Sequence, residues 1–378
     1  MTSKVNLLGL IQGWSFQEKK GSAFYNLFQK LHQAGNMCDV VDFEIPPVIR
    51  KAYFAKNISM SKDRWNVKDQ LDVGRYHLAS KYARDAIEAV ESPYNSVIQI
   101  GSNFRIDATP IIKEREVPLF SFHDNNFSSY ARSISSGIVA NDVLHRAFNF
   151  EKSVYESLTR IFTMSKTLRR SFIEDFGLPE EKVVYAGFGS PFSINGPLDK
   201  SYSQKNILFV ATHSFEAKGG KELLDAFRRV RKVIPDVTLT MIGKDWGIDE
   251  PGIECLGFLD KRNSGDLAIY KRCFEAASLF ILPSHNEAFG EVFIEAMSYG
   301  VPCIGTRTGV MPELIEDNDS GFVVDPGDSE GLTNLIIELI ESEEDLRKLG
   351  KAGFRAVSNE YQWSTVTSRI IKEVECFV

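Results

Sequence analysis

Residues 279–300, LFILPSHNEAFGEVFIEAMSYG, place three glutamates around a Phe-Gly pair where a helix is expected to begin. Glu291 and Glu295 share one helical face, and like charges at that spacing destabilise a helix by about 0.2–0.5 kcal/mol. A carboxylate can instead accept two hydrogen bonds from a vicinal diol, while Gly290 lets backbone N–H groups approach an anion. The pattern indicates a ligand with hydroxyls and phosphate, unless these are first-turn glutamates favoured by the helix dipole.

Two further stretches carry polar residues where a strand is expected to end. Lys218 precedes Gly219 and Gly220 in NILFVATHSFEAKGGKELLDAF, and an ammonium with glycines beside it suits a diphosphate. His123 lies in SFHDNNF at the end of another apolar run. Taken alone, the lysine is equally compatible with an ordinary surface residue, and the histidine with a structural one.

The elements that would position these residues are short β-branched and aromatic runs alternating with helical patterns. Such alternation predicts parallel sheets with crossover helices. Strands are expected in the first half at 5–11, 38–43, 96–101, 117–122, 160–165 and 183–187, and in the second at 206–212, 237–243, 253–258, 279–284, 301–306 and 321–324. In such sheets ligands bind beyond the carboxyl ends of the strands, where the residues above fall.

A segment rich in Gly, Ser and Pro, GFGSPFSINGPLDKSYSQKN, separates the two sets of strands and is typical of a linker. The fold class is therefore α/β, with two Rossmann-like, doubly wound domains. We expect one domain over residues 1–195 and a second over 196–360. Residues 361–378 are expected to form a helix that packs back on the first domain.

Composition narrows the classes of function. The 378 residues are 43% hydrophobic and 25% charged, with a net charge of −7, which argues against a nucleic-acid-binding protein. The charge is uneven: residues 1–195 carry 24 basic and 21 acidic side chains, whereas the rest carry 20 and 30. The first half is the part suited to an anionic partner, including peripheral contact with a membrane.

Five cysteines without C-x-x-C spacing suggest neither a disulfide framework nor a zinc site. The apolar run near the amino terminus lacks a small-residue cleavage site and is too short to span a membrane. A buried first strand is the better interpretation, and we expect a cytoplasmic protein.

The stretch from Glu287 to Glu295, with seven residues between, resembles the E-x7-E motif of retaining glycosyltransferases of the GT-B fold, in the glycogen-synthase-like family four. The resemblance extends over FTMSKTLRRSFIEDFGLPEEKVVYAGFG, ILFVATHSFEAKGG, the long segment around the two glutamates and Trp363. It implies two Rossmann-like domains, with the second binding a nucleotide-diphosphate sugar and the first binding the acceptor.

On the donor side, the resemblance implies that Glu287 holds the sugar hydroxyls together with backbone amides near Phe289 and Gly290. Glu295 would hold the ribose diol. Lys218 would bind the diphosphate and stabilise its charge as it leaves.

The base pocket would form near Gly243 and Phe258. On the acceptor side, His123 would contact the transferred sugar, and Gly13 and Gly21 would flank a loop near the acceptor and the phosphates. The candidate catalytic residues are thus His123, Lys218 and Glu287.

Two positions depart from the family pattern. Thr212 stands where the family often has an arginine six residues before the lysine, and Thr308 where it often has a second glycine. Arg307 is a candidate for the missing cation. These departures bear on how the phosphates are held.

Asp317-Asn318-Asp319 has the D-x-D spacing that binds a divalent ion in the other glycosyltransferase fold. It lies before Gly321 in a polar stretch, so we expect a solvated turn. Neither a metal nor another cofactor is expected.

The sequence therefore predicts a retaining hexosyltransferase that moves a sugar from a nucleotide-diphosphate sugar, such as a UDP- or GDP-sugar, to a hydroxyl acceptor. The acceptor could be a glycan, a lipid-linked sugar, a protein or a small molecule. Alternatives on the same scaffold are a sugar-nucleotide epimerase, a phosphorylase with pyridoxal phosphate and a non-catalytic nucleotide-sugar-binding module.

Overall fold

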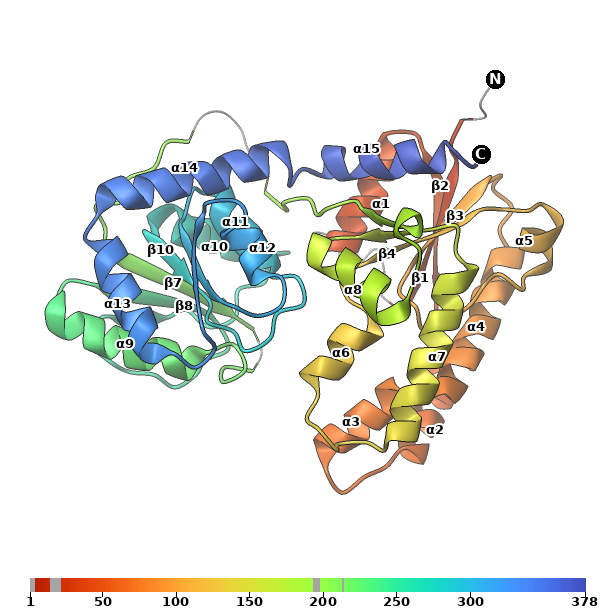
Figure 1. The fold of residues 1–378 in the computed structure, drawn as a ribbon, viewed down its shortest axis with the longest axis horizontal. Helices are drawn as coiled ribbons and strands as arrows, with labels where there is room; N and C mark the ends of the chain where they lie inside the picture. The colour runs from red at the N-terminus through yellow and green to blue at the C-terminus, as the bar shows by residue number, and fades with distance from the viewer. Residues whose placement is uncertain (1–3, 14–21, 193–197, 213) are drawn as a thin grey trace. The chain divides into compact units, whose positions relative to one another are not determined.

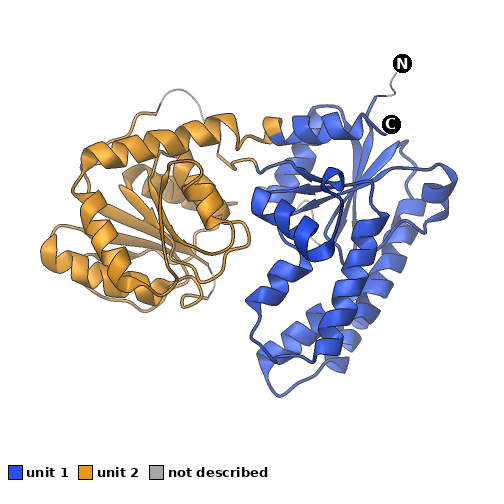
Figure 2. Cartoon of the chain, in the orientation of Figure 1, with its two compact units in different colours: residues 1–188, 366–378 blue, residues 189–365 orange. Residues whose placement is uncertain are grey.

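The computed structural model describes residues 4–13, 22–192, 198–212 and 214–378, which form two compact units (Figure 2). Unit 1 comprises Met1–Phe188 with Val366–Val378, and unit 2 comprises Gly189–Thr365. The expected boundary after residue 195 thus falls after residue 188, and the final helix is shared between the units.

Unit 1 is built on a six-stranded parallel sheet with helices on both faces (Figure 1). Its strands are β1 (Leu7–Gln12), β2 (Met37–Phe43), β3 (Ser96–Ile100), β4 (Leu119–His123), β5 (Arg160–Thr163) and β6 (Val183–Tyr185). The strand order is β2-β1-β3-β4-β5-β6. The order reverses direction between β1 and β3, which is the point where doubly wound sheets bind ligands.

The helices of unit 1 vary from one turn to nearly five. They are α1 (Ala23–Gln33), α2 (Pro47–Lys56), α3 (Lys62–Gln70), α4 (Val73–Glu88), α5 (Pro110–Glu114), α6 (Phe127–Ser133), α7 (Asn141–Ser157), α8 (Lys166–Phe176) and most of α15 (Trp363–Val374). Helix α1 begins at the cap Ser22, whose hydroxyl accepts a hydrogen bond from the Tyr25 N–H. Its buried Leu27, Phe28 and Leu31 follow the expected helical spacing.

Unit 2 has a second six-stranded parallel sheet, of order β12-β11-β10-β7-β8-β9. Its strands are β7 (Asn206–Ala211), β8 (Thr238–Gly243), β9 (Ile253–Cys255), β10 (Leu279–Ile281), β11 (Cys303–Thr306) and β12 (Gly321–Val324). Its helices are α9 (Gly220–Val233), α10 (Ser264–Ala276), α11 (Glu291–Ser298), α12 (Met311–Ile315), α13 (Ser329–Ile340) and α14 (Glu343–Asn359). This is the Rossmann order, with its reversal between β7 and β10.

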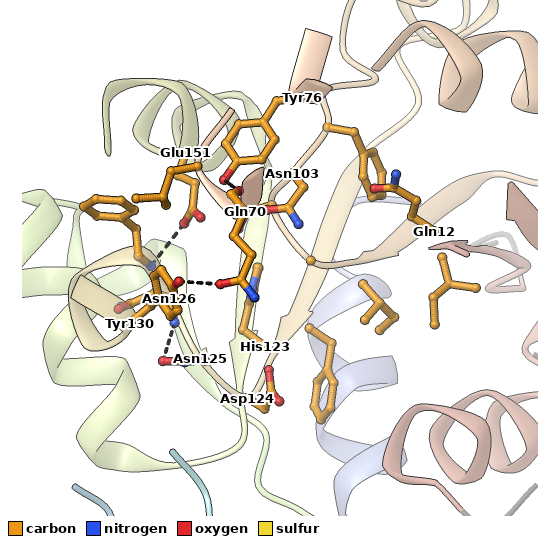
Figure 3. Close-up of a pocket in the computed structure, with 18 of the residues that line it drawn as sticks. Gln12, Gln70, Tyr76, Asn103, His123, Asp124, Asn125, Asn126, Tyr130 and Glu151 are labelled. Atoms are coloured by element: carbon orange, nitrogen blue, oxygen red, sulfur yellow. Dashed lines mark hydrogen bonds between the residues drawn. The ribbon is translucent and has the colours of Figure 1, made fainter. Parts of the chain in front are cut away.

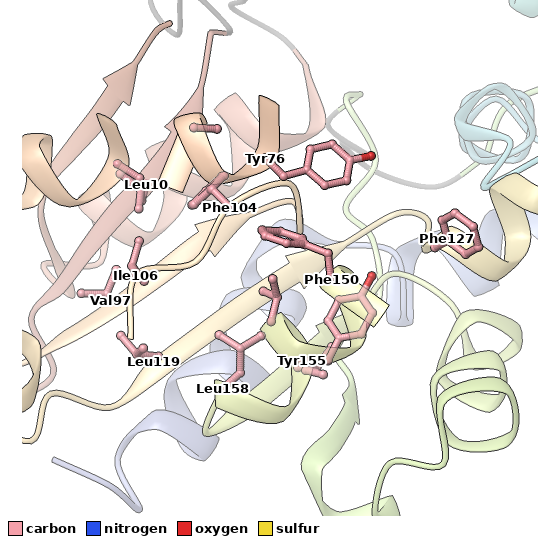
Figure 4. Close-up of a cluster of buried hydrophobic side chains, with 14 of the residues drawn as sticks. Leu10, Tyr76, Val97, Phe104, Ile106, Leu119, Phe127, Phe150, Tyr155 and Leu158 are labelled. Atoms are coloured by element: carbon pink, nitrogen blue, oxygen red, sulfur yellow. The ribbon is translucent and has the colours of Figure 1, made fainter. Parts of the chain in front are cut away.

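The predicted fold class is confirmed, because each expected strand overlaps an observed one. Strands β3 and β4 are buried along their whole length, as expected for sheets covered on both faces. Around the sheet of unit 1, apolar side chains from strands and helices form one core, including Leu10, Val97 and Phe150 (Figure 4).

The end of the chain packs within unit 1. The Arg369 guanidinium donates a hydrogen bond to the Ala186 carbonyl, and the Phe377 ring meets the Phe120 ring edge-on with centroids 6.1 Å apart. Arg160 lies over the Phe377 ring at 4.7 Å. Among the described residues, none of the helices is long and apolar enough to cross a membrane.

Candidate functional site

Two loops meet at the reversal point of the second sheet, one after β7 and one after β10. The two strands pair in parallel, so their carboxyl ends lie at the same edge. The His285 N–H and the Ser284 hydroxyl both donate to the Ala217 carbonyl, at 2.9 and 3.2 Å. These bonds fix the lysine-bearing loop against the glutamate-bearing loop.

Lys218 and Glu287 form an ion pair across these loops. The Lys218 Nζ lies 2.6 Å from Glu287 Oε2, and the two side chains are 28% and 13% exposed. The structure therefore brings together two of the predicted site residues, 69 positions apart in the sequence. The pair leaves two ammonium donors and further carboxylate lone pairs for a ligand.

Glycines allow the backbone to pass closely at this edge. Gly219 has a φ of 72°, and a Cβ there would lie 2.0 Å from the Pro283 carbonyl oxygen. Gly309 has a φ of 55°, and a Cβ would lie 2.2 Å from the Glu287 carbonyl oxygen. Side chains at either position would force these loops apart.

Helix α11 begins beside Glu287. Gly290 is its amino-terminal cap in the left-handed region, with a φ of 75°, and the neighbouring Phe289 is buried. A Cβ on Gly290 would lie 3.1 Å from the Glu287 Cγ. The amino end of the helix, which attracts anions, is thus next to the Lys218–Glu287 pair.

Glu295, one turn into α11, is 1% exposed and has two partners that the sequence analysis missed. Lys261 Nζ lies 2.5 Å from its Oε1, and the Tyr270 hydroxyl donates to its Oε2 at 2.5 Å. Burial, together with the Glu295 charge, raises the pKa of Tyr270 well above its ordinary value, so the phenol remains a donor. These contacts offset the repulsion expected between Glu295 and Glu291.

The position of Lys261 in the sequence could have indicated that it lies near the site. Lys261 lies three residues after Phe258, which is expected in the base pocket, in the segment that follows β9. Its ammonium also lies 4.6 Å from the centre of the Tyr270 ring. A cation beside a buried carboxylate is therefore part of this end of the site.

Gly243 and Phe258 border the same edge at β8. Gly243 ends the strand with a φ of 141°, and a Cβ would lie 1.7 Å from the Ala211 carbonyl oxygen. Its N–H donates to the Gly257 carbonyl at 2.9 Å. The adjacent Phe258 ring is 65% exposed and is available to contact a planar base.

Thr212 and Thr308 occupy the positions that departed from the family pattern, and Arg307 was the candidate for the missing cation. Thr212 follows β7 directly and is exposed. Arg307 follows β11, and its guanidinium lies 3.3 Å from Glu316 and 3.9 Å from Asp325. These two carboxylates already partner Arg307. Thr308, by contrast, turns its hydroxyl to the Ser284 carbonyl at 3.3 Å.

The D-x-D stretch lies in a turn between α12 and β12. The Asn318 amide donates to the carbonyls of Glu313 and Leu314 and to the Tyr361 hydroxyl, and Asp319 has a φ of 51°. Within the described ranges, no three His, Cys, Asp or Glu side chains are grouped as a metal site would need.

In unit 1 a cavity of about 410 Å³ opens at the corresponding reversal point (Figure 3). It lies at the carboxyl ends of β1, β3 and β4, and this volume is within the usual range for ligand sites. Its polar lining includes the amides of Gln12, Gln70, Asn103, Asn125 and Asn126, the hydroxyls of Tyr76, Ser102 and Tyr130, and the side chains of Arg75, His123, Asp124 and Glu151. Together these groups donate and accept hydrogen bonds, which suits hydroxyl-bearing ligands.

His123, the last residue of β4, lines this cavity and is 3% exposed. Its Nε2 lies 2.8 Å from the Ser121 hydroxyl, and its ring meets those of Tyr155 and Phe172 edge-on. Burial lowers the pKa of His123 to about 3. The imidazole is therefore neutral near pH 7 and acts there as a hydrogen-bonding group.

Glu151, from α7, is a buried carboxyl that the sequence analysis did not single out. It accepts hydrogen bonds from the Tyr155 hydroxyl and from the Phe127 N–H, the latter at 3.2 Å. Burial raises the pKa of Glu151. A glutamate on a helix gives no sequence signal that distinguishes it from a solvated one.

Gly13 directly follows β1, with a φ of 61°, and its N–H donates to the Phe43 carbonyl at 2.8 Å. It borders a second hollow of about 210 Å³ that shares Gln12 and Asn103 with the larger cavity. Gly21 lies outside the described residues.

Comparison with known proteins places the second unit in a family. Residues 198–356 match the family described as "Glycosyl transferases group 1". N-acetyl-alpha-D-glucosaminyl L-malate synthase of Bacillus anthracis is 38% identical over 93 residues, which are 25% of this chain and 24% of that protein. Phosphatidyl-myo-inositol mannosyltransferase of Mycobacterium leprae is 25% identical over 325 residues, covering 78% and 84% of the two chains.

The fold has relatives among solved structures. Sucrose-phosphate synthase from Thermosynechococcus elongatus superimposes with a TM-score of 0.68, at 15% identity, over 98% of both chains. Anabaena HepE in complex with UDP and glucose superimposes with a TM-score of 0.63, at 17% identity, over 99% of this chain and 100% of that one. The chain therefore has the GT-B fold, and its second unit, over residues 198–356, matches the group 1 glycosyltransferases.

Proposed function

We propose that this protein is a retaining glycosyltransferase that moves a sugar from a nucleotide-diphosphate sugar to a hydroxyl acceptor. The observation that carries the proposal is the Lys218–Glu287 pair beside the amino end of α11, at the reversal point of the second sheet. A cation for phosphate, a carboxylate for hydroxyls and helix-end amides are together what a sugar diphosphate requires.

Each group has a role in the proposed reaction. Lys218 and the amides at Gly290 hold the diphosphate, Glu287 accepts bonds from the sugar hydroxyls, and Glu295 receives the ribose diol with Lys261 and Tyr270 orienting it. Phe258 and the backbone near Gly243 contact the base. The acceptor enters the amide-lined cavity of unit 1, where His123 lies.

The proposed displacement occurs on one face of the sugar. The bond between the anomeric carbon and the diphosphate oxygen breaks, the acceptor oxygen forms the new bond on the same face, and the acceptor proton passes to the departing diphosphate. Lys218 and the helix-end amides stabilise the negative charge that develops on that group, an electrostatic contact of a kind often worth about 2.7–4 kcal/mol. No side chain is needed as the base.

The test is a thermal-shift screen with UDP, GDP and ADP sugars, followed by product analysis with a panel of hydroxyl acceptors. UDP is the first choice because HepE is solved with it. A selective donor raises the melting temperature by mass action. Anomer-retaining transfer supports the proposal. Conversion of the donor without an acceptor would indicate an epimerase. Absorbance from bound pyridoxal phosphate would indicate a phosphorylase. Donor binding without turnover would indicate a non-catalytic module.

A further inference from the structure

Helices α2 and α3 follow one another in the chain and form a hairpin at one end of unit 1 (Figure 1). None of the residues of α2 is buried. Ile49, Tyr53 and Asn57 are half-buried, with Ile49 packed against the core, while Phe54 stacks on Trp65 and Arg50 lines the smaller hollow of unit 1. The other residues of α2 are exposed to solvent.

Exposed apolar side chains concentrate on this hairpin. Of the eight large hydrophobic side chains exposed in the described ranges, four lie within residues 48–60. Val48 is 80% exposed, Ile58 67% and Met60 fully exposed. Monomeric proteins rarely gather such side chains without a binding role.

The same segment is strongly basic. Residues 47–70 contain six Lys or Arg and two Asp, a net charge of +4 in a chain whose net charge is −7. With the residues that the structure describes, Lys56 forms an ion pair with Asp72, whereas Arg50, Lys51, Lys62, Arg64 and Lys68 form none. Basic side chains without an ion pair therefore lie on the same two helices as the exposed apolar side chains, and Arg50 among them lines the smaller hollow of unit 1.

The hairpin is held in shape from within. Asp72 accepts hydrogen bonds from Lys56 and from the Asn57 amide, at 3.2 and 2.9 Å. The Trp65 indole donates to the Phe54 carbonyl at 2.6 Å, and the two rings stack with centroids 4.2 Å apart. Ile58 and Met60 follow this fixed part of the hairpin and are exposed.

We propose that the α2–α3 hairpin docks on an anionic lipid surface, with Val48, Ile58 and Met60 entering the headgroup boundary and lysines and arginines of the same two helices meeting lipid phosphates. Apolar side chains flanked by basic residues are the combination that binds such surfaces. A second copy of this chain is a poorer occupant, because a symmetric contact would oppose two positive faces. Nucleic acid would use exposed aromatic rings, whereas Trp65 is already stacked on Phe54.

The test measures sedimentation of the full chain with phosphatidylcholine vesicles, with and without added phosphatidylglycerol. We expect binding only to the anionic vesicles, and weaker binding at high salt because exposed charges are screened. The double variant Lys51→Gln, Lys62→Gln should bind the anionic vesicles about 25-fold more weakly, because each basic residue near the surface contributes about fivefold to the affinity. Ile58→Ser with Met60→Ser should also weaken binding.

The matched control is Val233→Ser with Phe322→Ser, which removes two exposed apolar side chains from unit 2 and should leave vesicle binding unchanged. All these positions are exposed, so the variants should fold, which circular dichroism checks. Equal binding to neutral vesicles, or hairpin variants that bind as the parent does, would overturn the proposal. So would a concentration-dependent dimer that Met60→Ser abolishes. The assay does not depend on transfer activity, so it stands or fails separately from the proposed reaction.

Discussion

At the scale of single residues, the Lys218–Glu287 ion pair determines which hydrogen-bonding groups of the two side chains remain for a ligand. Both side chains are partly exposed, and pairs of that kind contribute little to folding stability. The pair instead orients an ammonium that keeps two further donors for phosphate oxygens. We therefore expect the ion pair to matter for donor binding and turnover more than for folding stability.

Replacing Lys218 by alanine should lower kcat by about a hundredfold or more, because the contact strengthens as charge develops on the leaving diphosphate. Donor affinity should fall less, since the amides at the start of α11 still hold the ground state. Steady-state kinetics with calorimetry of donor binding measures both quantities.

Arg307→Ala is the control for that experiment, because Arg307 also follows a strand of the second sheet but has Glu316 and Asp325 as partners. We expect near-normal turnover from this variant. If Arg307→Ala abolishes transfer while Lys218→Ala does not, the diphosphate is bound by Arg307.

Glu295 and Glu287 should separate the two ends of the donor. Glutamine keeps the shape of each side chain, and at position 295 its carbonyl oxygen can still accept the hydrogen bond from the Tyr270 hydroxyl. Glu295→Gln should weaken binding of the free nucleoside diphosphate by about 1.5–3 kcal/mol, the range for a hydrogen bond to a charged group. Glu287→Gln should affect the sugar nucleotide and leave the free diphosphate nearly unchanged. Calorimetry with the sugar nucleotide and with the free nucleoside diphosphate measures both effects. If the two variants lose the same affinity for the free diphosphate, the roles given to Glu287 and Glu295 are wrong.

His123 should make unit 1 sensitive to acid. Its pKa is about 3 when folded and about 6.5 when unfolded, so the unfolded chain binds the proton first as the pH falls. The free energy of unfolding is therefore unaffected by this group above pH 6.5 and decreases by about 1.4 kcal/mol per pH unit between about pH 6.5 and pH 3. Urea titrations at several pH values should show a smaller decrease in His123→Gln. An identical pH dependence in both proteins would show that the histidine is not buried neutral.

At the scale of elements, the strands were predictable because sheets covered on both faces need continuous apolar runs, as in β3 and β4. The loops of the site were partly predictable, since Lys218, Glu287 and Gly290 follow strand ends. Their pairing was not, because it depends on which strands are neighbours. The contacts of Glu295 with Lys261 and Tyr270 join residues 34 and 25 positions apart, and no local pattern specifies them. Glu151 was missed because a glutamate on a helix has the same sequence pattern whether it is buried or solvated.

The start of α11 should depend on Gly290. An alanine there must adopt a φ near 75°, and its Cβ would lie 2.9 Å from Phe293. The left-handed region disfavours such a residue by about 1–2 kcal/mol, so stability should fall by about that amount or more. Donor affinity should fall as well, because the amides at the helix end move. Denaturant unfolding and calorimetry measure the two effects.

Gly327→Ala separates backbone strain from loss of the site. Gly327 has a φ of 84°, with nothing within 4 Å of an added Cβ, and lies in the turn before α13. We expect a comparable strain without an effect on donor binding. Weakened binding in this variant too would mean that Gly290 acts through overall stability.

At the scale of the whole molecule, each unit has its own parallel sheet and its own core, and the chain passes between them at 188–189 and again at 365–366. The candidate donor residues all belong to unit 2, and the amide-lined cavity belongs to unit 1. A ligand that binds one unit stabilises that unit directly. Stabilisation of the other unit requires that the two unfold together.

Hydrogen exchange should reveal this division. A nucleoside diphosphate at about 100 times its dissociation constant stabilises the unit that binds it by about 2.7 kcal/mol, which slows exchange through unfolding about a hundredfold. We expect that slowing in β7, β8 and β10 and much less in β3 and β4, because the units have separate cores. Lys218→Ala with Glu295→Gln should remove most of the protection and serves as the control. Equal slowing in both sheets would show that the chain unfolds as one cooperative body, and slowing in β3 and β4 alone would place the nucleotide in unit 1.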